Sequence, residues 1–137
     1  LVGLGLLDLV TVPMAKRAIG ELLEEPLIEG VTELLTGFEN HGGGTILGDD
    51  ASPLGRVIHG VGNREEPPGV AKYSGAVQGN IVATYLHGPA LARNPQLADL
   101  LLGWAVEREL EPLVLAQVEA LRKKRISAVN AVGGVDG

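Results

Sequence analysis

The segment GNIVATYLHGPALARNPQLADLLLGWAVEREL, residues 79–110, joins the strongest strand pattern of the chain to its strongest helix pattern. Residues 79–86 predict a strand, because four of their side chains favour extended backbone: Ile81, Val82, Thr84 and Tyr85. His87 follows, and the Gly88-Pro89 turn is expected to end the strand there. This order places a histidine at the carboxyl end of a strand, where ligands collect in open α/β sheets.

Residues 95–110 predict a helix. Asn94 is a suitable N-cap, and Pro95 has the backbone shape of a first helical turn. One face of this helix is apolar and carries Leu97, Leu100, Leu101, Trp104 and Ala105. That face is expected to pack against the core.

The rest of the chain is expected to form shorter elements. Residues 17–23 fit a short strand or a helical turn, and the strand is favoured. Further strands are predicted at 31–38 and 55–60. Residues 39–44, ENHGGG, are polar and glycine-rich, so we expect them to leave regular structure and to allow another group to approach their backbone. A second helix is predicted from Pro112 to the basic cluster 122–125, which is expected to be solvated at the helix end. Residues 1–126 are predicted to form one domain and residues 127–137 a disordered tail.

Composition limits the classes of function. The chain has 137 residues, of which 45% are hydrophobic, and this suits one domain with a real core. Eleven basic against 17 acidic residues give a formal charge of −6, so the basic field that attracts nucleic acids or anionic bilayers is missing. The apolar runs are shorter than the roughly 20 residues that span a bilayer, so no membrane insertion is expected.

Cysteine is absent, which excludes disulfides, thiolate metal sites and thiol nucleophiles from these 137 residues. The first residues, LVGLGLLDLV, lack an initiator methionine and the basic region of a signal peptide. They are expected to be an internal part of a larger protein. Together with the missing cysteines, they predict a cytoplasmic location.

Three histidines are the side chains that can move protons near neutral pH. His59 lies in an apolar run and is expected to be a half-buried structural residue. His41 lies in the glycine-rich segment, where it either lines a pocket or hydrogen-bonds the turn. His87, at the end of the predicted strand, is the candidate for a functional role.

Other kinds of site have little support. Residues 42–44 lack the Lys-Ser/Thr pair of a phosphate-binding loop. No third ligand is suitably spaced with His41 and His87 to hold a metal ion. None of the serines lies in a G-x-S-x-G sequence. The sequence therefore predicts no metal, no cofactor and no nucleophile for covalent catalysis.

Five segments, in this order, resemble the class I glutamine amidotransferase domains of the cobyric-acid-synthase-like group: LVGLGLLDL, AKRAIGE, TGFENHGG, PLGRVIHGVGN and TYLHGPALARNPQLADLLL. Within this group they look most like the glutaminase subunits of lipid II isoglutaminyl synthases. The resemblance covers about residues 1–110. It implies a flavodoxin-like α/β fold, of which this chain is the C-terminal part.

The resemblance also implies roles for single residues. In the family, a cysteine on a tight strand-to-helix turn attacks glutamine, and the histidine of the TYLHGP string activates that cysteine. This histidine is His87, which the resemblance makes the catalytic residue. Arg17 of AKRAIGE matches a basic residue implicated in binding the substrate, L-glutamine. From the residues alone, Arg17 is equally well explained as a surface charge beside Lys16.

The chain departs from the family pattern in three places. The cysteine-bearing half is missing, so the chain is expected to be inactive alone and to need the N-terminal half of its own domain. Pro89 stands two residues after His87, where many class I amidotransferases have a glutamate, although the cobyric-acid-like group also lacks one there. Gly44 stands where related glutaminase subunits usually have an arginine.

Three functions remain open. The first is a glutaminase subunit that supplies ammonia to an ATP-dependent, Mur-ligase-like (MurT-type) synthase, which amidates the glutamate of lipid II in peptidoglycan synthesis. The second is a cobyrinic or cobyric acid amidase domain. The third is a non-catalytic α/β module that only binds a synthase. A Cys-Gly-Gly sequence after an apolar strand upstream of Leu1 would favour the enzymes over the module.

Overall fold

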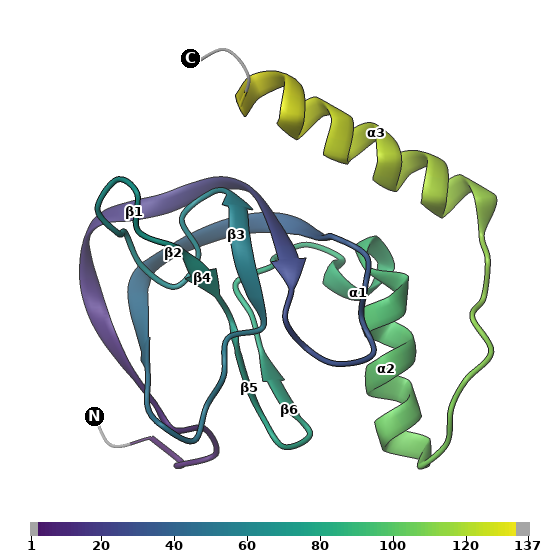
Figure 1. Cartoon of the computed structure of the whole chain (residues 1–137), viewed down its shortest axis with the longest axis horizontal. Helices are drawn as coiled ribbons and strands as arrows, with labels where there is room; N and C mark the ends of the chain where they lie inside the picture. Colours follow the sequence, from purple (N-terminus) through teal and green to yellow (C-terminus); the bar gives the residue numbers. More distant parts are fainter. Residues whose placement is uncertain (1–2, 134–137) are drawn as a thin grey trace.

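The computed structural model describes residues 3–133, which form two sheets with helices α1 and α2 at one end and helix α3 running beside them (Figure 1). The elements are β1 (Leu9–Pro26), β2 (Leu35–Leu47), β3 (Gly55–His59), β4 (Tyr73–Ser74), β5 (Ala76–Gln78), β6 (Ile81–Ala83), α1 (Ala90–Arg93), α2 (Pro95–Val106) and α3 (Ala116–Gly133). One sheet has the strand order β2-β1-β3-β4, and β5 and β6 form a second. Every strand pair in this part of the chain is antiparallel.

The long pair β1–β2 is the frame to which the other elements attach. The two strands pair along most of their length, with a register shift between Pro13 and Ala18. The strand predicted at 17–23 is confirmed as the central part of β1, and the strand predicted at 55–60 is confirmed as β3.

The prediction that residues 39–44 leave regular structure is wrong. Strand β2 continues through them, because their backbone pairs with β1. Glycine weakens a strand locally, but the ladder of hydrogen bonds to β1 offsets that cost. The expected close approach to this backbone is present, since a Cβ at Gly44 would lie 3.1 Å from Cγ of Met14.

The strand predicted at 79–86 is much shorter in the structure, where β6 has only three residues. The backbone N–H of Leu86 donates to Oγ1 of Thr84 at 3.0 Å, and this local bond replaces a continued ladder. His87 then pairs through its backbone with Phe38 of β2, with 2.8 Å between His87 N and Phe38 O. His87 therefore lies beside β2 instead of at the end of a long strand.

The core lies between the sheet and α2, and its buried members are Leu22, Val31, Leu35, Leu54, Leu86 and Leu97. Leu86 approaches β2 most closely at Gly37. A Cβ at Gly37 would lie 2.6 Å from a side-chain carbon of Leu86 and 2.9 Å from its Cα. Only glycine fits there without moving the backbone of Leu86.

Helix α2 begins at Pro95 as predicted and ends at Val106, before the expected end at Leu110. Asn94 makes no N-cap bond with its side chain. Its Oδ1 instead accepts from the backbone N–H of Thr36 at 2.8 Å, and its Nδ2 donates to the carbonyl of Thr36 at 2.9 Å. These buried bonds fix the start of α2 to β2.

Helix α3 begins at Ala116 instead of Pro112, and the basic cluster 122–125 lies inside it. The prediction that this cluster ends a helix is therefore wrong, whereas the expected exposure holds for Lys123 and Lys124. Arg122 is buried, because its guanidinium pairs with Glu33 at 3.2 Å and donates to the carbonyl of Leu34.

Helix α3 also continues past residue 126, where the sequence predicts the change from domain to tail. Residues 127–133 are helical, and residues 134–137 of the expected tail lie outside the described residues. The division of the chain at residue 126 stays a prediction.

Candidate functional site

Arg17 and His87 flank β2 from its two edges. Arg17, on β1, donates from Nε to Oδ1 of Asn40 at 2.7 Å and from Nη2 to the carbonyl of Asn40 at 3.4 Å. On the other edge of β2, the backbone of His87 pairs with Phe38. Both Arg17 and His87 are exposed. The structure thus brings these two residues, far apart in the sequence, to one strand.

Phe38 and Asn40 share one face of β2, because side chains two residues apart in a strand point the same way. About 7 Å of strand separates them. The face is open to solvent, with Phe38 exposed at 38% and Ile19 of the neighbouring strand at 63%. Cross-strand partners lie on the same face, so His87 joins this surface as well.

This surface, formed by Arg17, Ile19, Phe38, Asn40 and His87, is called the outer face below. An exposed imidazole can accept a proton and return it, and a guanidinium can bind a carboxylate through two hydrogen bonds. The outer face can therefore hold an acidic ligand and exchange protons with it. It offers no group that forms a covalent bond by itself.

His41 is buried, at 8% exposure, in a cluster of polar side chains. Its Nδ1 lies 2.8 Å from the carbonyl of Gly43, and its Nε2 lies 3.3 Å from Oε2 of Glu39. The His41 ring stacks on the ring of Tyr85, with 3.6 Å between centroids and 11° between planes. Of the two alternatives for His41, the structure supports hydrogen bonding within the fold.

Glu39 holds the loop that follows β3. Its Oε1 accepts from the backbone N–H of Val61 at 2.7 Å, and its Oε2 accepts from that of Gly62 at 3.0 Å. Gly60 has a φ of 109°, and a Cβ there would lie 2.7 Å from Oε1 of Glu39. The loop closes on the carboxylate because Gly60 leaves that space free. These bonds satisfy a carboxylate that is only 1% exposed.

Sequence reasoning missed Glu39 and Tyr85 as members of this cluster. Glu39 and His41 are two residues apart, so a strand places them on one face. Because residues 39–44 were expected to be irregular, the sequence did not predict that these two side chains lie together. Tyr85 comes from a distant part of the chain. No spacing in the sequence indicates that its ring meets His41.

Glu24 is a second buried carboxylate, on β1. It is 0% exposed, and neither oxygen has a hydrogen-bond partner within the described residues. Burial raises the pKa of Glu24 to about 7, while the nearby Ser74 hydroxyl lowers it and the Glu39 carboxylate raises it further. Glu24 therefore changes charge near neutral pH, and the stability of the fold depends on pH there.

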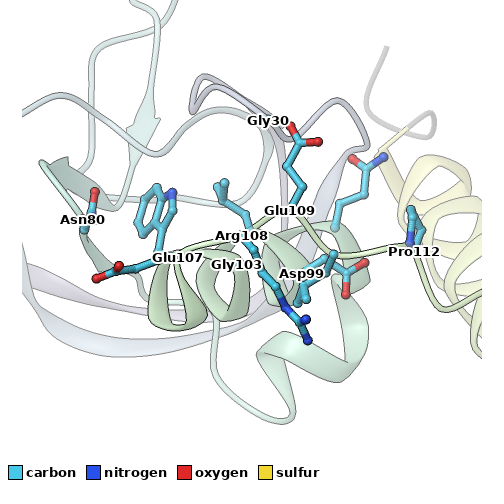
Figure 2. A pocket seen from close by; sticks show the side chains of 12 residues that line it. Gly30, Asn80, Asp99, Gly103, Glu107, Arg108, Glu109 and Pro112 are labelled. Carbon is cyan, nitrogen blue, oxygen red and sulfur yellow. The ribbon is translucent and has the colours of Figure 1, made fainter.

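A cavity of about 650 Å³ lies along α2. Asp99, Glu107, Arg108 and Glu109 surround it, as Figure 2 shows. Neither Arg17 nor any of the three histidines lines it. The cavity is thus separate from the outer face.

His59 and Gly44 were also noted in the sequence, and neither lies on the outer face. His59 is half-buried on β3, as predicted. Gly44 is buried, and besides Met14 a Cβ there would lie 3.3 Å from the carbonyl of Asn63. A longer side chain at position 44 therefore requires its neighbours to move.

Within residues 3–133, no three His, Asp or Glu side chains gather closely enough to hold a metal ion. No helix in the described part of the chain has the length and apolar character needed to cross a membrane.

Comparison with known proteins places these residues in a family. Residues 1–95 match the CobB/CobQ-like glutamine amidotransferase domain. The Staphylococcus aureus protein "Lipid II isoglutaminyl synthase (glutamine-hydrolyzing) subunit GatD" is 38% identical over 117 residues, 85% of this chain and 44% of that protein. The Streptococcus pneumoniae protein of the same name is 43% identical over 81 residues, 59% of this chain and 30% of that protein. A probable cobyric acid synthase of Methanothermobacter thermautotrophicus is 38% identical over 92 residues, 63% of this chain and 17% of that protein.

This chain thus spans less than half the length of the curated relatives that it matches. The family match covers residues 1–95 and includes both Arg17 and His87. It agrees with the mixture of sheet and helix in the structure and confirms the α/β class I amidotransferase fold. The chain belongs to the CobB/CobQ-like glutamine amidotransferase family.

Proposed function

We propose that this chain supplies the histidine side of a glutaminase active site, and that a cysteine elsewhere in the whole protein supplies the nucleophile. The observation that carries the proposal is the placement of Arg17 and His87 on one exposed face of β2. Family membership supplies the substrate class, because glutamine is the nitrogen donor of amidotransferases. Within the described residues, the His87 side chain makes no hydrogen bond, and the Arg17 guanidinium hydrogen-bonds only to Asn40.

In this proposal His87 moves the protons of the reaction. It takes the proton of the cysteine thiol, and the thiolate bonds to the side-chain carbonyl carbon of glutamine. The C–N bond then breaks, and the leaving nitrogen takes the proton from the His87 imidazolium and departs as ammonia. Water next attacks the thioester and passes a proton to His87, which returns it to the sulfur as glutamate leaves. Free ammonia remains for a synthase.

Arg17 binds the substrate in this scheme. Its Nε and Nη2 contact Asn40, which leaves Nη1 without a hydrogen-bond partner within the described residues. A guanidinium anchored in this way is preorganised to receive the α-carboxylate of glutamine.

Replacing Arg17 by alanine in the whole protein is expected to raise the KM for glutamine about 10- to 150-fold, because a hydrogen bond to a charged group contributes about 1.5–3 kcal/mol. The kcat should change little, since this contact exists before and during the reaction. Lys16→Ala is the matched control, because Lys16 is an exposed neighbour of the same charge. An Arg17→Ala protein with the KM of the wild type would show that Arg17 is only a surface charge and does not bind glutamine.

We further propose that the ammonia serves a Mur-ligase-like (MurT-type) synthase in the cytoplasm, which amidates the glutamate of lipid II. The support is the 38–43% identity to the two glutamine-hydrolyzing lipid II isoglutaminyl synthase subunits. A second candidate, amidation of cobyrinic or cobyric acid, is supported by the 38% identity to a probable cobyric acid synthase.

Acceptor assays separate these two functions. The whole protein, copurified with its synthase, would be given ATP, glutamine and either lipid II or a cobyrinic acid substrate. Amide formation on lipid II alone is the expected result, and amide formation on the corrinoid alone would overturn it. If the whole protein has no cysteine at the nucleophile position, and neither acceptor is amidated, the non-catalytic module is the better description.

A further inference from the structure

We propose that His41 and Tyr85, held by Glu39, form a positioning element that fixes the segment 84–87 against β2 and thereby sets the place of the His87 side chain. This inference rests on the proposed function of His87. It assigns a task to a buried cluster that is not part of the outer face.

Three consecutive residues attach this segment to β2. The ring of Tyr85 stacks on His41. The side chain of Leu86 lies over Gly37, where no Cβ fits. The backbone of His87 pairs with Phe38. The two strings TGFENHGG and TYLHGP are therefore packing partners, and β2 is the surface against which the histidine segment is placed.

The Tyr85 side chain is held through its hydroxyl group as well as through the face of its ring. Its hydroxyl donates to the carbonyl of Gly43 at 3.1 Å and lies 2.8 Å from Oγ1 of Thr45. The same carbonyl oxygen lies 2.8 Å from Nδ1 of His41. Gly43 thus aligns the two stacked rings, so that a change at either one disturbs the other.

Both nitrogens of the His41 ring face acceptors, namely the carbonyl of Gly43 and the carboxylate of Glu39. The ring is therefore held at both nitrogens and on one face, by Gly43, Glu39 and the Tyr85 ring. Asparagine or leucine at these positions removes the stack, whereas phenylalanine at position 85 keeps it.

His87 needs such support, because its own side chain makes no hydrogen bond within the described residues and its segment leaves regular structure after β6. An acid–base group that is displaced by about 1 Å loses up to about 100-fold in rate. Glu39 itself is a poor target for a test, since it also binds the loop at 61–62. The test therefore uses His41 and Tyr85.

The first measurement is amide hydrogen exchange of residues 84–88 in the whole protein, and it does not depend on activity. Tyr85→Leu and His41→Asn are expected to speed exchange there at least about tenfold, because the pairing of His87 with Phe38 opens more often. Tyr85→Phe should restore most of the protection. Tyr73→Leu and His59→Asn are matched controls on β4 and β3 and should leave this exchange unchanged. Unchanged exchange in both test variants would overturn the proposal.

The second measurement is glutamine hydrolysis by the same proteins. Tyr85→Leu and His41→Asn should lower kcat about 10- to 100-fold while KM stays within about twofold, since only the transition state needs His87 in place. Leu97→Ala, which removes a buried side chain of α2, controls for lost stability and should keep its kcat when folded. A kcat within twofold of the wild type in both test variants overturns the positioning role, and His87→Ala then shows whether the proposed function still holds.

Discussion

Replacing His87 by alanine in the whole protein is expected to lower the kcat for glutamine hydrolysis about 10²–10⁴-fold, the usual contribution of a general acid–base group. Without the imidazole, the cysteine thiol stays mostly protonated at neutral pH and the leaving nitrogen has no proton donor. Steady-state release of ammonia or glutamate measures the loss. We expect no other single side chain of this chain to change kcat by as much.

The protein should remain folded, because His87 is exposed and pairs with Phe38 through its backbone alone. His59→Ala is the matched control, since His59 is half-buried on β3 and has no assigned role. Its kcat should equal that of the wild type. A folded His87→Ala protein with a near-normal kcat would remove His87 from the reaction.

Replacing Glu24 by glutamine is expected to stabilise the fold at pH 8 relative to pH 4, by about 3 kcal/mol. Burial raises the pKa of Glu24 from 4.5 to about 7, so between these pH values the folded state holds a proton that the unfolded state has released. The free energy of unfolding therefore falls as pH rises through this range. Well below pH 4.5 Glu24 is protonated in both states and its ionisation carries no penalty, whereas well above pH 7 the full ionisation penalty applies.

Glutamine cannot ionise, so the Glu24→Gln protein should lack this part of the pH dependence. Urea unfolding of wild type and variant at pH 4 and pH 8 gives the difference directly. Glu25→Gln is the control, because the Glu25 side chain is 49% exposed and paired with Arg56, so its removal should change stability little. Equal pH dependence in the wild type and the Glu24→Gln protein would show that Glu24 is not the buried, proton-binding group described here.

Residue preferences in the sequence were sufficient to predict an element where its own residues determine its secondary structure. The start of α2 at Pro95 and the strand that begins at Gly55 follow from residue preferences and local turn signals. The start of α3 differs, since residues 113–115 are exposed apolar residues without a good cap and the helix begins only at Ala116. The burial of Arg122 depends on Glu33, which a local pattern does not reveal.

Contacts between distant segments explain the remaining differences. Residues 39–44 are poor strand formers by composition, yet β1 pairs with them and makes them a strand. The reverse holds for Thr84, Tyr85 and Leu86, which favour strand but turn away from β6 to pack on β2. Both outcomes depend on pairings that no spacing in the sequence indicates.

The candidate site divides in the same way. The roles of His87 in the reaction and of Arg17 in binding glutamine were inferred from the resemblance of the strings TYLHGP and AKRAIGE to the family. In the structure, Arg17 and His87 lie on one face of β2. The supporting cluster of Glu39, His41 and Tyr85 was not predicted, because it assembles only when β2 is a continuous strand.

Ammonia release from glutamine, measured under the same conditions for this 137-residue chain and for the whole protein, decides whether the nucleophile lies outside these residues. We expect only background release from the chain, which has no cysteine, and turnover by the whole protein that His87→Ala removes. Turnover by the 137-residue chain alone that disappears with His87→Ala would contradict this expectation, because the nucleophile would then lie within these residues.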